Sequence, residues 1–117
     1  MAAILIIEDE PLIAMMLEDF VESLDHKVVG TPDSVEDALA AVEGDDFDVA
    51  ILDINLRENT ASWPVADALA DKGKPFILAS GGQIDSPPER HAMAAYLAKP
   101  YTLDAVREAI EQALTST

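Results

Sequence analysis

The stretch A-I-L-I-I-E-D-E-P, residues 3–11, sets the architecture of the whole chain. Its apolar residues form a short continuous run, which is typical of a β-strand buried on both faces. The run ends at three adjacent acids, Glu8, Asp9 and Glu10, whose carboxylates repel one another. Pro11 then begins a helix, because proline suits the first helical turn. The stretch therefore predicts a buried strand that is followed, at the edge of the sheet, by negatively charged side chains.

The rest of the chain repeats this alternation of short apolar runs and helical stripes. Further strands are predicted at 26–31, 47–53, 75–80 and 95–98. Helices are predicted at 11–24, 35–42, 64–70, 89–93 (a short one) and 103–114. Five strands alternating with five helices predict a doubly wound α/β domain, with a parallel sheet and helices on both faces. We expect this single domain to cover residues 1–117.

Polar residues at the expected helix starts predict specific caps. Ser34 and Asp37 resemble a capping box before the second helix. Thr102 is the predicted N-cap of the last helix, and Glu10 is expected to cap the first. His26 is expected on the surface.

The composition of the chain argues against several classes of function. The 117 residues carry 23 acids against 7 Lys and Arg, a net charge of −16, and no cysteine. A field of this sign repels phosphate backbones, so direct nucleic-acid binding is not expected. Neither a membrane span nor a signal peptide is predicted. We therefore expect a cytoplasmic protein without disulfides or thiolate metal sites.

Residues with complementary chemistry stand at the ends of the predicted strands. Because parallel strands end at one edge of a sheet, Glu8, Asp9 and Asp53 should meet there, with Ser80 and Lys99 nearby. Carboxylate oxygens are the ligands that Mg²⁺ prefers. The set predicts phosphoryl transfer, with Asp53 as nucleophile, Lys99 offsetting charge and Ser80 donating a hydrogen bond.

Four motifs in the right order carry a resemblance to a known family. They are I-I-E-D-E-P at 6–11, I-L-D-I-N-L at 51–56, F-I-L-A-S-G at 76–81 and Y-L-A-K-P at 96–100. The chain resembles a response-regulator receiver domain of two-component signalling, and in particular a subgroup of stand-alone receivers from alphaproteobacteria. The resemblance implies the flavodoxin-like (βα)5 fold, with strand order 2-1-3-4-5.

The resemblance also implies roles for the acidic residues. Glu8 and Asp9 match the acidic pair that holds Mg²⁺, and Asp9 matches its direct ligand. Asp53 matches the phosphoacceptor and a further metal ligand. Asn55 matches the position whose backbone carbonyl binds the metal.

Two further positions match the parts that sense the phosphoryl group. Ser80 matches the hydroxyl that moves toward it, and Tyr96 matches the aromatic residue that moves with the hydroxyl. Lys99 matches the lysine that contacts the phosphoryl group, and the resemblance implies a cis bond between Lys99 and Pro100.

The implied function is signalling rather than enzymatic turnover, apart from self-catalysed phosphoryl transfer and autodephosphorylation. A histidine kinase or phosphotransfer protein would be the donor. The output would be a contact with a downstream protein or a phosphorelay. The stretch 56–59, L-R-E-N, departs from the family pattern, and Pro87 and Pro88 leave little room for a fourth helix.

Two alternatives remain open at this stage. One is a receiver-like interaction module that is never phosphorylated, which the unusual stretch after Asp53 favours. The other is a small Mg²⁺-dependent phosphohydrolase with an Asp nucleophile. Such enzymes use a second Asp as acid or base, and Asn55 at the matching position cannot transfer a proton.

Overall fold

Strands and helices alternate along the chain, as the hydrophobic pattern predicts. The computed structural model describes residues 2–44, 46–53, 55–56, 60–61, 63–80, 95–98 and 101–115. In chain order the elements are β1 (Ala3–Ile7), α1 (Pro11–Ser23), β2 (Lys27–Gly30), α2 (Val35–Gly44), β3 (Val49–Asp53), β4 (Asn55–Leu56), β5 (Thr60–Ala61), α3 (Trp63–Asp71), β6 (Phe76–Ser80), β7 (Ala95–Ala98) and α4 (Leu103–Thr115). The short helix predicted at 89–93 lies outside the described residues.

The main sheet has five parallel strands in the order β2-β1-β3-β6-β7. Counted among the parallel strands alone, this is the predicted order 2-1-3-4-5, so the prediction of the fold is confirmed. The chain adds strands first on one side of β1 and then on the other. The carboxyl ends of β1 and β3 therefore lie side by side where the strand order reverses, which is where ligands bind in such sheets.

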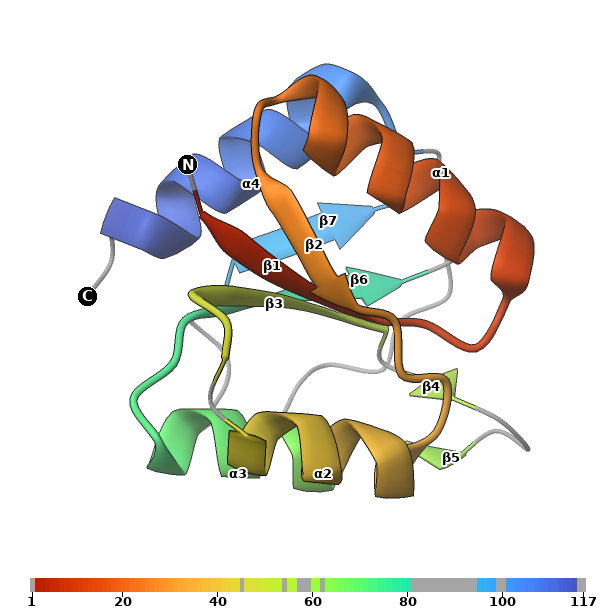
Figure 1. Cartoon of the computed structure of the whole chain (residues 1–117), viewed down its shortest axis with the longest axis vertical. Helices are drawn as coiled ribbons and strands as arrows, with labels where there is room; N and C mark the ends of the chain where they lie inside the picture. Colours follow the sequence, from red (N-terminus) through yellow and green to blue (C-terminus); the bar gives the residue numbers. More distant parts are fainter. Residues whose placement is uncertain are drawn as a thin grey trace.

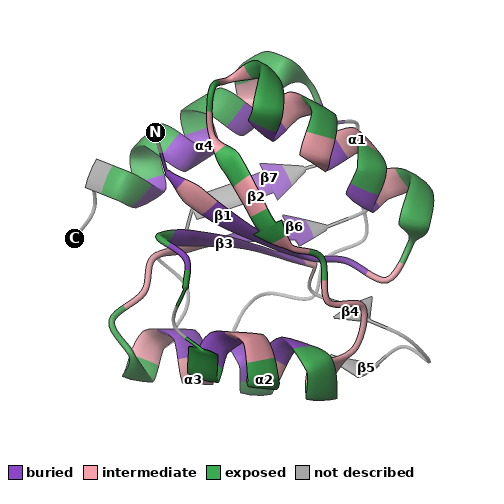
Figure 2. Cartoon of the chain, in the orientation of Figure 1, coloured by how far each residue is buried: buried purple, intermediate pink, exposed green. Residues whose placement is uncertain are grey.

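Helices cover both faces of the sheet, with α1 and α4 on one face and α2 and α3 on the other (Figure 1). The side chains of β1 alternate between the two. Ile4 and Ile6 belong to the core beneath α1 and α4, whereas Leu5 and Ile7 belong to the core against α2 and α3. In Figure 2 the colour that marks buried residues runs along β1 and β3 and along the sides of the helices that face the sheet. Complete burial of such an aliphatic side chain stabilises the fold by about 1.5–3 kcal/mol.

Two of the three predicted helix caps are present. The Asp37 N–H donates to Ser34 Oγ at 3.1 Å, and the Ala105 N–H donates to Thr102 Oγ1 at 3.1 Å. The prediction for Glu10 was wrong: it occupies the N-cap position of α1, but its side chain makes no capping hydrogen bond. The residues that cap well are Ser, Thr, Asp and Asn, whose short side chains reach the N–H groups of the first turn, and Glu is not among them.

Two further local predictions were wrong. The polar stretch L-R-E-N-T-A-S, residues 56–62, predicts a loop, yet Leu56 and Thr60–Ala61 belong to the paired antiparallel strands β4 and β5. An antiparallel pair needs only a short connection and satisfies backbone groups that a loop would leave to water. His26 is half-buried rather than on the surface, and its Nδ1 accepts a hydrogen bond from the Ala2 N–H at 3.0 Å.

Candidate functional site

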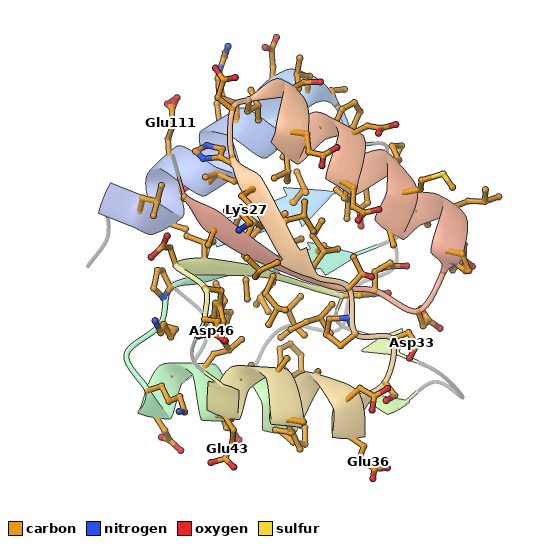
Figure 3. The ribbon with its side chains drawn as sticks, in the orientation of Figure 1. Lys27, Asp33, Glu36, Glu43, Asp46 and Glu111 are labelled. Carbon is orange, nitrogen blue, oxygen red and sulfur yellow. The ribbon has the colours of Figure 1, made fainter. Side chains whose placement is uncertain are left out.

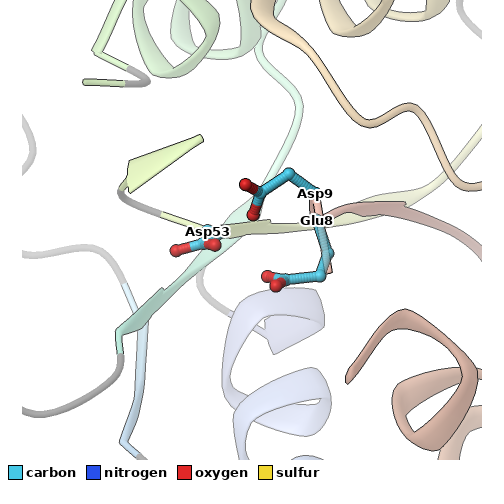
Figure 4. Close-up of side chains that lie close together, drawn as sticks. All are labelled: Glu8, Asp9 and Asp53. Carbon is cyan, nitrogen blue, oxygen red and sulfur yellow. The ribbon is translucent and has the colours of Figure 1, made fainter. Parts of the chain in front are cut away.

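Three carboxyl groups meet where β1 and β3 end. The parallel register sets Ile7 beside Leu52, so Glu8, which follows β1, and Asp53, the last residue of β3, lie at the same level. One carboxylate oxygen from each of Glu8, Asp9 and Asp53 lies within 4.8 Å of the others. Figure 4 shows the three side chains turned toward one another. The predicted convergence of these acids is therefore present in the fold.

Glu8 is the buried member of the cluster, with only 3% of its surface exposed. Its position continues the alternation of Ile4 and Ile6, and its N–H donates to the Pro32 carbonyl at 3.2 Å. This backbone bond ties the residue to the segment after β2, so its carboxyl group stays under the surface.

Burial raises the pKa of Glu8 from its ordinary value of 4.5 to about 8. A hydrogen bond to Asp53 and the negative charges of Asp53 and Asp9 act in the same direction. The Glu10 N–H, which donates to Glu8 Oε1 at 3.3 Å, opposes them by stabilising the carboxylate. Without a cation, Glu8 therefore holds a proton at neutral pH and donates a hydrogen bond to Asp53.

Asp9 and Asp53 are half-buried, so water and small ions can reach them. Oxygens bound to one octahedral Mg²⁺ ion lie about 2.9–4.2 Å apart, given Mg–O distances of about 2.1 Å. Small side-chain rotations would bring the three oxygens into that range. A cation would also replace the proton that now reduces repulsion in the cluster. The donor set therefore fits a hard divalent ion that keeps several of its waters.

The backbone places one more predicted site residue, Ser80, at the same edge. Ser80 is the last residue of β6, and it pairs with Ala98 at the end of β7. Asn55 begins β4 shortly after Asp53, and Tyr96 lies in β7. The side chains of Ser80, Asn55 and Tyr96 lie outside the described part of the structure.

Lys99 and Pro100 lie outside the described residues, and so does the predicted cis bond between them. Lys99 directly follows the last residue of β7 in the sequence. Its predicted place beside the carboxylates therefore rests on sequence position.

Sequence reasoning found the three acids but missed the protonation of Glu8. It treated the cluster as three equal charges. The alternation of β1 directs position 8 to the same side as Ile4 and Ile6, but it does not set how deeply the side chain is buried. A strand that is apolar on both faces gives no sign of how far its burial continues past the last apolar residue.

Within the described segments, no helix is long and apolar enough to cross a membrane.

Residues 4–111 match the sequence model of a family described as the response regulator receiver domain. The chain is 52% identical to SdrG from Sphingomonas melonis Fr1, whose solution structure superimposes with a TM-score of 0.88 and 98% coverage of both chains. The BeF3-activated conformation of SdrG, from Pseudomonas melonis Fr1, has a TM-score of 0.80 at the same identity and covers 97% of this chain and 96% of that one.

A longer protein also matches. The chain is 36% identical to the phyllosphere-induced regulator PhyR of Methylorubrum extorquens, in an alignment of 117 positions that covers 95% of this chain and 43% of PhyR. The chain therefore spans less than half of the length of this relative.

Proposed function

Because the chain belongs to the response regulator receiver domain family, whose members are signalling domains rather than enzymes, we propose that Asp53 accepts a phosphoryl group from a histidine kinase or a phosphotransfer protein. The observation that supports this proposal best is the convergence of Glu8, Asp9 and Asp53 within 4.8 Å at the reversal of the strand order. A structural cap or a solubilising charge would need no such gathering of like charges.

Transfer begins with a carboxylate oxygen of Asp53 attacking the phosphorus atom of the donor. A new P–O bond forms as the P–N bond of a phosphohistidine breaks, and the imidazole leaves with the electron pair of that bond. Partial exposure of Asp53 lets a donor side chain approach. In the metal-free protein, a hydrogen bond from protonated Glu8 orients the Asp53 carboxyl group.

Glu8, Asp9, Asp53 and the backbone carbonyl of Asn55 would hold Mg²⁺. The ion supplies positive charge that offsets the carboxylates and the oxygens of the transferred group. Glu8 must give up its proton to become a ligand, so its raised pKa links ion binding to pH. Lys99 offsets charge on a second phosphoryl oxygen, and Ser80 donates a hydrogen bond to a third.

Phosphorylation shifts the domain between two surface states through Ser80 and Tyr96. The solution structure of SdrG in a BeF3-activated conformation supports the existence of such a state in a relative that is 52% identical. PhyR from Bartonella quintana is described as an anti-anti-sigma factor and is 32% identical. That name supports a downstream protein as the partner of this chain.

Incubation with acetyl phosphate and Mg²⁺, followed by intact-mass measurement, tests the proposal. We expect one phosphoryl group on the wild type, none on Asp53→Asn, and none in EDTA. An adduct on Asp53→Asn would contradict the assignment of the acceptor. Formation of no adduct at all would favour an interaction module that is never phosphorylated, and repeated hydrolysis of a phosphate ester would favour a phosphohydrolase.

A further inference from the structure

A groove of about 420 Å³ lies between α2 and α3, among side chains that the proposed function does not use. It is lined by Leu39, Ala40, Val42, Glu43, Ala68, Asp71 and Lys72. The two helices lie side by side on the face of the sheet opposite α1 and α4 (Figure 1). The groove is therefore separate from the carboxylate site.

The floor of the groove is apolar. Val42 is buried, and Leu39 and Ala68 are half-buried, so aliphatic surface faces the groove between the helices. Pockets of about 300–1,000 Å³ suit compact ligands. A space of this size holds one large apolar side chain of a bound segment and part of the residues next to it in that segment.

The surroundings of the groove are acidic. Helices α2 and α3 contain Glu36, Asp37, Glu43, Asp67 and Asp71 but no Lys or Arg. Figure 3 shows Glu36 and Glu43 pointing away from the sheet.

The charge is concentrated at one end of the groove. Glu43 and Asp71 lie in the last turns of their helices, where the helix dipole is already negative. The cation that lines the groove is Lys72, whose Nζ donates to the Glu43 carbonyl at 3.2 Å.

We propose that this groove docks a segment of a partner protein in which a large apolar side chain is flanked by Lys or Arg. The apolar side chain would fill the space above Leu39, Val42 and Ala68. The basic residues would lie near Glu43 and Asp71. A second copy of this chain is a poor occupant, because it brings the same acidic helices and a net charge of −16.

Titration of the ¹⁵N-labelled full chain with the blocked tripeptide acetyl-Arg-Phe-Arg-amide tests the proposal. Saturating Mg²⁺ is present to neutralise the carboxylate site. We expect amide shifts centred on Leu39, Val42 and Ala68. Binding of acetyl-Arg-Ser-Arg-amide should be at least fivefold weaker, because it lacks the apolar anchor.

Variants separate the groove from general attraction to an acidic protein. Glu43→Gln should weaken binding of the Phe peptide about two- to fivefold, as loss of one exposed ion pair does. Glu22→Gln, the same change at an exposed site on α1, should leave it unchanged. Ala40→Lys, at an exposed position of the groove, should abolish binding, and Ala68→Lys provides a second obstruction if the first variant does not fold.

The proposal is overturned if the shifts map elsewhere, if the Ser peptide binds as well as the Phe peptide, or if the two Gln variants weaken binding equally. It is also overturned if the folded Lys variant binds like the wild type. Asp53→Asn should bind the Phe peptide normally. Failure of the phosphorylation proposal and failure of this one are therefore distinguishable.

Discussion

Glu8 is a buried carboxyl group that holds a proton in the metal-free protein and that, in the proposed function, would exchange this proton for a metal ion. Burial and the neighbouring Asp53 raise its pKa to about 8, whereas the Glu10 N–H favours its charged form. The unfolded chain would hold this proton only below about pH 4.5, the ordinary value. The folded, metal-free protein therefore binds one more proton than the unfolded chain across the interval between the two values.

The first prediction concerns pH in EDTA. Since the folded pKa of Glu8 is raised, its contribution to stability is complete below the unfolded pKa and is lost as pH rises through about 8. The free energy of unfolding should fall by up to about 1.4 kcal/mol per pH unit in that interval. Between about pH 6 and pH 9 the expected loss is about 2–3 kcal/mol, measured by urea denaturation.

Glu8→Gln is the matched control for this measurement. The amide keeps the shape and the hydrogen bond but cannot titrate, so the slope should flatten over the same interval. An equal slope in both proteins would show that another group is responsible.

The second prediction concerns Asp53→Asn. The change removes one negative charge from the cluster while keeping an oxygen that can accept the Glu8 hydrogen bond. We expect it to stabilise the metal-free protein by about 1–2 kcal/mol. Thermal melts in EDTA measure this effect.

Melts in millimolar Mg²⁺ provide the comparison. Ion binding to the folded state raises the melting temperature, and the effect should be larger in the wild type, which has one more ligand charge. A variant that melts lower than wild type in EDTA, or an equal gain from Mg²⁺, would contradict the proposed cluster.

At the site, the sequence was sufficient to predict which residue types meet, because strand ends in a parallel sheet share one edge. Glu8, Asp9 and Asp53 were located in this way. Protonation of Glu8 was not predictable, because it depends on how deeply the first residue after a strand is covered. That depth is set by the packing of distant elements.

At the scale of the element, α4 begins with a cap that the sequence predicts. The Ala105 N–H donates to Thr102 Oγ1, and this bond satisfies a backbone donor that the helix leaves unpaired. α4 packs Val106 and Ile110 into the core beneath the sheet. The cap therefore fixes the start of a helix that closes one face of the protein.

The third prediction tests this cap. Thr102→Ala should lower the free energy of unfolding by about 1 kcal/mol, because an N–H is left without its partner. Thr102→Ser keeps the hydroxyl and should stay within about 0.5 kcal/mol of the wild type. Glu10→Ala should likewise have little effect through capping, since Glu10 makes no capping bond. A similar loss in all three variants, measured by urea denaturation, would argue against a specific cap.

Sequence periodicity was sufficient to locate the strands and helices of the main sheet that the structure describes. It failed on β4 and β5, because two-residue strands are too short to show an alternation of apolar and polar residues. His26 was misjudged for a related reason. Its hydrogen bond to Ala2 joins segments 24 residues apart, and no local pattern reports such a contact.

For the whole molecule, the net charge of −16 opposes folding, because a compact state brings like charges together. In α2 and α3 there are no basic residues to offset this charge. The fold tolerates it because two apolar cores lie on either side of the sheet.

The fourth prediction follows from that balance. Raising KCl from about 20 mM to about 500 mM in EDTA should raise the melting temperature, because salt shortens the range of repulsion between exposed charges. The double variant Asp19→Lys with Glu22→Lys reduces the net charge on an exposed part of α1, and it should respond less to salt. A melting temperature that falls with KCl would show that attractive ion pairs dominate instead.

The interior position of β1 also has a consequence for synthesis on the ribosome. Ile4 of β1 pairs with Val49 of β3, so the first strand to emerge waits for a neighbour 45 residues behind it. At roughly 5–20 residues per second, that delay is about 2–9 s. During this time Glu8 and Asp9 have been translated, but Asp53 has not joined them. Under the proposed function, phosphorylation of Asp53 can therefore begin only after β3 has joined β1.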